Sequence, residues 1–199
     1  LMEWLSAGTI ILGDGAMGTM LHAKGMTAGD SPELWNVTHP EILAEVHREY
    51  CSAGARVVTA NTFGGTRARL QHNGLEKRAT ELNEAAVQIA RSVADEFDCL
   101  VGGDLGPTGE LIEPSGLLTI GDAAQMYSEQ AEALLRGGVD YIHIETMTQI
   151  AEVEAAIRGT RAIDSGIDII ATMTFDTNGR TMMGDTPLGA LEAISGWGV

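Results

Sequence analysis

Five short runs of apolar residues recur along the chain. Each run is followed by a cluster rich in glycine and polar residues, and then by a stretch with helical periodicity. The runs are continuous rather than alternating, which is typical of parallel strands buried on both faces. They cover residues 9–12, 56–60, 100–103, 139–144 and 168–173. The alternation of such strands with helices predicts an α/β fold built on a parallel sheet.

Apolar residues at three- and four-residue spacing predict the helices between the runs. Residues 38–41 read Thr-His-Pro-Glu, which matches a capping box with proline in the first turn, and Gly54 can end that helix. We expect its apolar stripe to pack against the sheet through Ile42, Val46 and Tyr50. Four further stripes begin at Leu82, Tyr127, Ile150 and Pro187.

Polar and glycine-rich residues stand at the carboxyl end of all five predicted strands. The clusters read GDGAMGT, NTFGGTR, GDLGPTGE, ETMT and TFDTNGR. A doubly wound sheet usually concentrates function at one switch point, whereas a (β/α)8 barrel spreads it over all the loops at one face. The pattern therefore favours a (β/α)8 TIM barrel.

The length of the chain bears on this barrel. A complete barrel has eight βα units and typically about 250 residues, whereas these 199 residues supply about five units. Residues 196–199 resemble the lead-in to a sixth strand. We therefore expect residues 1–199 to be the N-terminal part of a barrel domain, truncated after about five βα units, with its C-terminal strands absent. Such a part should expose apolar surface.

Composition and charge exclude several classes of partner. The chain carries 12 basic against 28 acidic residues, a net charge of −16 that argues against nucleic-acid binding. No apolar run approaches the roughly 20 residues of a membrane span, and residues 1–10 do not resemble a signal peptide. The two cysteines form no disulfide framework, which suits a cytoplasmic protein.

The first strand-end cluster contains GDGAMG, which matches the G-x-G-x-x-G pattern of dinucleotide-binding loops. Its second position is Asp14, a carboxylate that would repel a pyrophosphate. The helix that should follow is stopped early by Gly25, and the next predicted strand ends in Asn61 rather than in an acid. We therefore do not favour a dinucleotide site.

Three carboxylates stand at predicted strand ends, namely Asp14, Asp104 and Glu145. At one mouth of a barrel they can converge on a pocket, where carboxylates can hold an ammonium group, bind a hard cation or act as general acids and bases. Each alone could instead cap the following helix. Asp14 and Glu145 beside exposed backbone N–H groups would suit the ammonium and carboxylate ends of an amino acid. Residues 61–64, Asn-Thr-Phe-Gly, add an amide, a hydroxyl and a ring, or simply form a turn.

Taken together, the motifs resemble the homocysteine S-methyltransferase family. LGDGAMGTM, SPELWNVTHPEIL, ANTFGGTR, GDLGPTGE, IETM and MTFDTNGR stand in the order expected of that family, from about residue 5 to residue 199. The match is nearest to the homocysteine-binding domain of cobalamin-dependent methionine synthases. The resemblance implies a (β/α)8 barrel that moves a methyl group onto the sulfur of homocysteine, giving methionine, with a zinc-bound thiolate as the nucleophile.

The resemblance also implies roles for particular residues. Asp14 and Glu145 would hold the substrate's amino group, and the backbone around Gly15 and Ala16 would take its carboxylate. Three further residues, Asn61, Thr62 and Asp104, would line the pocket. Methylcobalamin, on a corrinoid domain downstream, is the expected methyl donor, with S-methylmethionine or a betaine as alternatives.

The zinc ligands of the family are three cysteines, and all would lie beyond Val199. We expect Cys51 and Cys99 to be core residues out of reach of the pocket. His47 is expected on the outer helix ring and His143 in mid-strand. As it stands, the 199-residue chain should therefore be inactive.

Three other functions stay open from the sequence. One is a related corrinoid-linked methyltransferase that acts on another thiol or carrier. A second is a barrel lyase or hydrolase that uses Asp14, Asp104 and Glu145 around Mg²⁺. The third is a module that binds an amino-acid-like ligand without catalysis.

Overall fold

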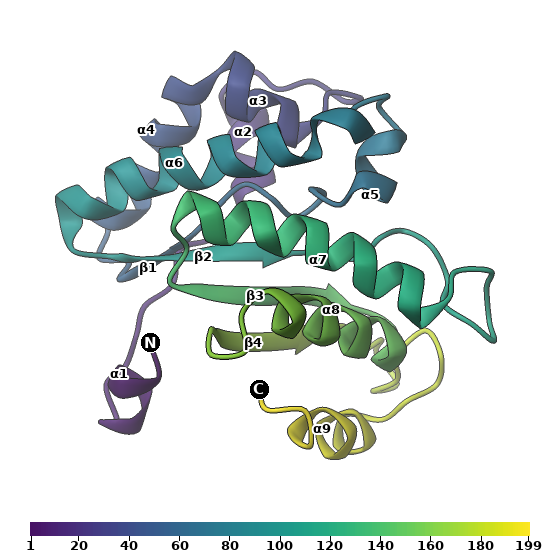
Figure 1. Cartoon of the computed structure of the whole chain (residues 1–199). Coiled ribbons are helices and arrows are strands. Elements are labelled where there is room, and N and C mark those ends of the chain that lie inside the picture. Colours follow the sequence, from purple (N-terminus) through teal and green to yellow (C-terminus); the bar gives the residue numbers. More distant parts are fainter.

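A four-stranded parallel sheet, in the order β1-β2-β3-β4, forms the centre of the computed structural model (Figure 1). The structure describes residues 1–199, apart from the side chains of residues 2 and 3. The strands are β1 (Val57–Thr59), β2 (Leu100–Leu105), β3 (Tyr141–Met147) and β4 (Asp168–Met173). Strands adjacent in sequence are adjacent in the sheet and parallel, so each connection returns through a helix. The α/β class and the parallel sheet are confirmed.

The helices follow the predicted stripes. The helices α6 (Ala79–Phe97), α7 (Ile120–Gly137) and α8 (Ile150–Ile163) connect the strands, α4 (Pro40–Ser52) precedes β1, and α9 (Pro187–Ser195) follows β4. Shorter ones are α1 (Met2–Ser6), α2 (Met17–Ala23), α3 (Pro32–Thr38), α5 (Arg67–Gln71) and the 3-10 turn η1 (Glu76–Arg78). Gly138 ends α7 in the left-handed conformation that glycine adopts without strain, at φ 94°.

The capping box predicted at residues 38–41 is wrong, although the helix is present. His39 is the N-cap of α4, and Thr38 is the last residue of α3. The Thr38 hydroxyl donates to the Leu34 carbonyl of its own helix and lies 2.8 Å from His39 Nδ1, and no described side chain caps the start of α4. The short α3 was not predicted, and it uses the threonine that the capping pattern requires.

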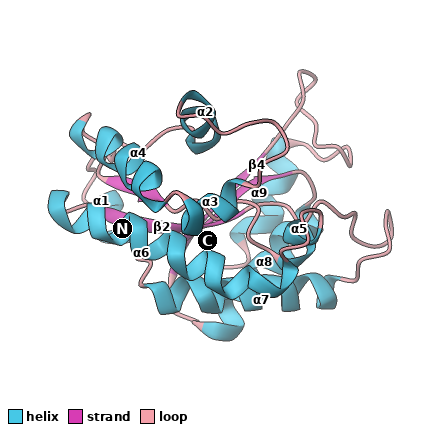
Figure 2. Cartoon of the chain, turned by 90° about the horizontal axis from the view of Figure 1, so that it is seen from above, coloured by secondary structure: helices cyan, strands magenta, loops and turns pink.

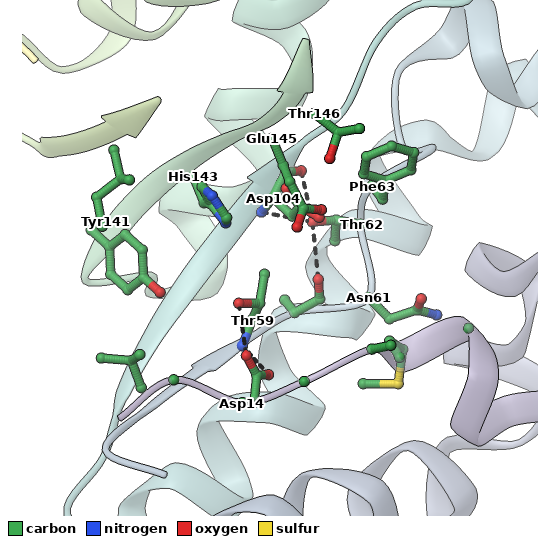
Figure 3. A pocket seen from close by; sticks show the side chains of 18 of the residues that line it. Asp14, Thr59, Asn61, Thr62, Phe63, Asp104, Tyr141, His143, Glu145 and Thr146 are labelled. Atoms are coloured by element: carbon green, nitrogen blue, oxygen red, sulfur yellow. Dashed lines mark hydrogen bonds between the residues drawn. The ribbon is translucent and has the colours of Figure 1, made fainter. Parts of the chain in front are cut away.

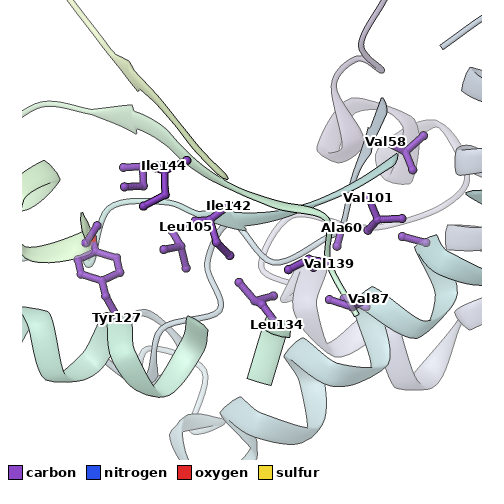
Figure 4. Close-up of a cluster of buried hydrophobic side chains, with 14 of the residues drawn as sticks. Val58, Ala60, Val87, Val101, Leu105, Tyr127, Leu134, Val139, Ile142 and Ile144 are labelled. Atoms are coloured by element: carbon purple, nitrogen blue, oxygen red, sulfur yellow. The ribbon is translucent and has the colours of Figure 1, made fainter. Parts of the chain in front are cut away.

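One face of the sheet is covered by helices. Seen from above, α6, α7 and α8 lie along one side of the strands (Figure 2). Alternate strand residues point into this layer, where Val58, Val101 and Ile142 meet Val87 and Leu134 with no exposed surface (Figure 4). Because a strand alternates its side chains, the residues between them point to the opposite face.

The first predicted strand, residues 9–12, is wrong. No strand forms there in the described chain, and the Ile10 side chain is 95% exposed. Backbone hydrogen bonds join this segment to β1 at residues 12–14, where Gly13 makes an isolated bridge to Val57. Residues 9–11 therefore extend past the end of the three-residue β1, where no neighbouring strand among the described elements is available for regular hydrogen bonding. The sheet has four strands where five were predicted.

Apolar side chains are exposed elsewhere, as expected of an open sheet. On α9, Leu188 and Leu191 are each 64% exposed, and Met182 in the preceding loop is 67% exposed. Leu191 belongs to a stripe predicted to pack inward, whereas Ile194 on the same helix does contact the core. Among the helices described, none has the length and apolar character needed to cross a membrane.

Candidate functional site

A pocket of about 820 Å³ lies on the face of the sheet opposite the α6–α8 layer (Figure 3). Its floor includes Tyr141, His143 and Glu145, which alternate along β3 with the core residues Ile142 and Ile144. All seven residues that the sequence suggested for substrate binding line this pocket. They are Asp14, Gly15, Ala16, Asn61, Thr62, Asp104 and Glu145. Their individual roles stay predictions.

Asp14 is fixed by the first strand of the sheet. Its carboxylate accepts hydrogen bonds from the Thr59 backbone N–H at 2.7 Å and from the Thr59 hydroxyl at 3.2 Å. Burial raises the pKa of Asp14 to about 6, although the two bonds from Thr59 favour the charged form, and the charge of Glu145 adds to the rise. The carboxylate thus changes its charge close to neutral pH.

The loop after Asp14 is fixed by a tyrosine of α4. The Tyr50 hydroxyl donates to the Ala16 carbonyl at 3.1 Å. A β-carbon on Gly15 would lie 2.9 Å from that hydroxyl, so glycine lets the loop approach the ring without displacing it. Gly15 and Ala16 are exposed to the pocket, which leaves their backbone accessible to a ligand. Tyr50 therefore does more than pack in the helix stripe where the sequence placed it.

Asp104 is the most deeply buried carboxylate of the pocket, with 4% of its surface exposed. Its Oδ1 atom has no hydrogen-bond partner among the described residues. Burial, followed by the nearby charge of Glu145, raises its pKa well above the usual range. Burial thus favours the neutral form of Asp104, which can donate as well as accept a hydrogen bond.

Asn61 and Thr62 line the pocket, but their donors are used within the protein. The Asn61 amide donates to the Pro32 carbonyl at 2.7 Å and to the Asn36 side chain at 2.9 Å, which attaches α3 to the sheet. The Thr62 hydroxyl donates to the Asp104 carbonyl at 2.9 Å and accepts from the Asp104 N–H at 3.0 Å. Both residues therefore support the pocket wall, and Thr62 fixes the backbone of Asp104.

Glu145 lies at an irregularity of β3. The register pairs Ile144 with Ala171 and Met147 with Met173, so two residues of β3 oppose the single Thr172 of β4. The second of these two, Thr146, has a positive φ of 60°. Glu145 is half-buried and points toward Asp104 in the pocket (Figure 3). This bulge could not be recognised from the spacing of residues in one strand.

Tyr141 and His143 were not among the predicted binding residues, although alternation with the apolar Ile142 and Ile144 would have placed them on the same face as Glu145. Burial raises the pKa of Tyr141 to about 12 and lowers the pKa of His143, so burial favours the neutral form of both. The lining also contains Glu33 but no lysine or arginine. The pocket is thus acidic and suits a ligand with a positive group.

The residues present do not fit a metal ion. Within the described chain, no group of three or more histidine, cysteine, aspartate or glutamate side chains could hold one. Cys51 and Cys99 are buried in the core on the helix side of the sheet, as predicted. Burial, together with Cys99, raises the pKa of the Cys51 thiol to about 12, which opposes the thiolate that zinc binds. The three pocket carboxylates likewise give the magnesium alternative no support.

His47 lies on α4 in the helix layer, as predicted, and its side chain is only 1% exposed. Neither ring nitrogen has a hydrogen-bond partner among the described residues. Burial lowers the pKa of His47 to about 4, so the ring is neutral at physiological pH and is no part of the pocket.

The chain is similar in sequence to known homocysteine methyltransferases. The model of the homocysteine S-methyltransferase family matches residues 11–198. Methionine synthase of Mycobacterium tuberculosis is 33% identical over 205 residues, which cover 96% of this chain and 17% of that protein. Betaine–homocysteine S-methyltransferase 1 of Mus musculus is 31% identical over 184 residues, which cover 90% of this chain and 44% of that protein. The chain thus spans less than half of either relative.

Solved structures agree with the sequence relatives. The metallated form of the homocysteine methyltransferase MmuM from Escherichia coli superposes with a TM-score of 0.81 at 26% identity. The match covers 97% of this chain and 73% of that structure. The oxidized form of the same enzyme gives a TM-score of 0.81 at 24% identity, which is a likeness of fold.

Proposed function

Because this chain belongs to the homocysteine S-methyltransferase family, we propose that it provides the homocysteine-binding pocket of an enzyme that transfers a methyl group to the homocysteine sulfur, giving methionine. The observation that carries the proposal is the acidic pocket, in which Asp14, Asp104 and Glu145 meet without a lysine or arginine. Such a lining favours the ammonium group of an amino acid.

Within this proposal, each part of the pocket has a task. Asp14 and Glu145 hold the substrate's ammonium group between the first loop and β3. The backbone N–H groups at Gly15 and Ala16 take the carboxylate, which a pocket without cationic side chains would otherwise repel. Asn61, Thr62 and Asp104 form the wall between them. The homocysteine side chain then extends along the open side of the sheet.

A zinc ion and a methyl donor belong to the same proposal, but the described residues do not hold them. By the resemblance, three cysteines outside these 199 residues would bind the zinc, which would supply a thiolate at neutral pH. Methylcobalamin on a corrinoid domain is the proposed donor, in keeping with the methionine synthase relative, and a betaine stays an alternative because a betaine–homocysteine methyltransferase is almost equally similar. We assign no step of the transfer to a residue of this chain.

We also propose that the sheet is part of a (β/α)8 barrel, with residues 1–199 as the N-terminal portion of the homocysteine-binding domain. The parallel order of β1 to β4 and the superposition on MmuM support this. In a closed barrel the pocket would lie at the mouth where the carboxyl ends of the strands meet.

Calorimetric titration of homocysteine under reducing conditions tests the function. We expect the intact protein to bind homocysteine, and Glu145→Ala to weaken binding about tenfold to a hundredfold, since a charge-assisted contact is lost. Glu132→Ala on the exposed side of α7 is the matched control and should bind normally. Equal affinity of the wild type and Glu145→Ala would remove Glu145 from the site. Tight binding without methyl transfer to any donor would favour the binding-only alternative.

A further inference from the structure

We propose that Thr172 of β4 is a positioning residue, which holds the bulge of β3 and thereby fixes where Glu145 lies in the pocket. The proposal rests on the proposed function, because it gives Thr172 a role only through the contact of Glu145 with the substrate's ammonium group. Thr172 itself lies outside the lining of the pocket.

The bulge leaves backbone groups of β3 without their usual partners. Ladder pairing stops at Ile144 opposite Ala171 and resumes at Met147 opposite Met173. Two residues, Glu145 and Thr146, therefore share the space opposite one residue of β4. In a bulge the extra residue breaks the regular hydrogen-bond pattern and turns the strand.

The Thr172 hydroxyl replaces the missing ladder bonds. Its Oγ1 accepts a hydrogen bond from the Thr146 N–H at 3.1 Å and donates to the Ile144 carbonyl at 3.4 Å. One side chain thus bridges both ends of the two-residue bulge. Beyond it, the Thr174 N–H donates to the Met147 carbonyl at 2.8 Å, which resumes the regular connection between the strands.

The backbone conformation of Thr146 is unfavourable without support from surrounding contacts. Thr146 has a φ of 60°, and a β-branched residue in the left-handed region costs on the order of 1–3 kcal/mol. Such a conformation persists where surrounding contacts enforce it. The hydrogen bond to Thr172 acts at the Thr146 N–H itself.

The bulge determines where one carboxylate lies. Alternation along β3 turns Glu145 to the pocket face with Tyr141 and His143, whereas Met147, two residues further on, is fully buried. The change of face falls at the extra residue, so the bulge sets the backbone directly beside Glu145. Thr172 is exposed, so packing does not explain a threonine at this position. Its hydroxyl bonds the backbone on both sides of Glu145.

The experiment compares homocysteine binding by Thr172→Val and Thr172→Ser under reducing conditions. Valine has nearly the shape of threonine but can neither accept nor donate, so we expect affinity to fall about tenfold, the effect of losing roughly one hydrogen bond. Serine keeps the hydroxyl and should bind as the wild type does. Thr172→Ala serves as a second variant without the hydroxyl, and thermal unfolding shows that each variant is folded.

Two readouts separate positioning from a merely structural role. The loss in Thr172→Val should disappear in a Glu145→Gln background, because Thr172 acts through that carboxylate. The loss should also be absent for 4-mercaptobutanoate, which has the thiol and carboxylate of homocysteine but no amino group. Additive losses, or equal losses for both ligands, would overturn the inference.

The outcomes also distinguish this inference from the proposed function. If the wild type does not bind homocysteine, the proposed function fails and the role of Thr172 fails with it. If Glu145→Gln impairs binding while Thr172→Val and Thr172→Ala bind normally, the function stands and the positioning role of Thr172 is wrong.

Discussion

The carboxylate of Asp14 accepts hydrogen bonds from both the backbone N–H and the hydroxyl of Thr59, and these bonds join the glycine-rich first loop to β1. This pairing holds an acid at the pocket even though the preceding residues 9–12 form no strand. The side chain of Asp14 thus attaches the loop to β1, as a longer run of backbone pairing would have done.

Homocysteine binding should weaken in mild acid. Burial raises the pKa of Asp14 to about 6, and only the ionised carboxylate attracts an ammonium group. Affinity should therefore be nearly constant above pH 7 and fall by up to about tenfold per pH unit below 6. Calorimetry between pH 5 and 8 measures this. Asp14→Asn should bind more weakly and lose that part of the pH dependence; an unchanged profile would assign it to another group.

Asp104 should lower stability as the pH rises. Its pKa is raised above the unfolded value by burial and by Glu145, so the folded state retains a proton that the unfolded chain releases. The folded state is favoured in acid and loses this advantage as the pH rises toward the folded pKa. Urea unfolding should show a shallower decline with pH for Asp104→Asn than for the wild type. Parallel curves would show that Asp104 ionises freely.

His47 should lower stability in acid. Its pKa falls to about 4 from an ordinary value of 6.5 because the ring is buried, and it has no hydrogen-bond partner among the described residues. The unfolded chain therefore binds a proton first, and stability that is complete above pH 6.5 is lost as the pH falls toward 4, by roughly 3 kcal/mol. His47→Leu should abolish this loss in urea unfolding at pH 4.5 and 7. Equal losses for both proteins would contradict it.

A buried glutamate should stabilise the loop after β2. Glu152 of α8, 1% exposed, accepts from the Thr108 N–H at 2.8 Å, from the Thr108 hydroxyl at 2.7 Å and from the Tyr127 hydroxyl at 3.1 Å. Glu152→Ala leaves the two Thr108 donors without this acceptor, while the Tyr127 hydroxyl can still donate to the Gly106 carbonyl at 3.1 Å. The substitution should cost about 3 kcal/mol of unfolding free energy. The exposed Glu132→Ala should cost no more than about 0.5 kcal/mol. Similar losses would show that Glu152 is replaceable.

Much of the fold was predictable because its helices leave periodic patterns of apolar residues in the sequence. The stripes from Leu82, Tyr127 and Ile150 became α6, α7 and α8, since each could be buried on only one face. The run at residues 9–12 failed because an apolar run reports a tendency to be buried, whereas a strand also needs a partner of matching length. The short β1 does not provide one.

The candidate site was predictable in position but not in detail. Strand ends located Asp14, Asp104 and Glu145, because parallel strands bring their carboxyl ends to one edge. The engagement of Asn61 with Asn36, and the bulge opposite Thr172, depend on contacts between distant segments. No local pattern encodes those contacts, so the sequence could not assign them.

The absence of lysine and arginine from the pocket lining also determines which molecules are kept out. A second anionic group on a ligand, as in aspartate, glutamate or a phosphorylated amino acid, would meet carboxylates and no lysine or arginine of the described lining beyond the backbone slot proposed at Gly15 and Ala16. Repulsion between like charges is strong where water is scarce. If the pocket binds an amino acid as proposed, it would discriminate by charge before it discriminates by size, and it would favour amino acids with an uncharged side chain.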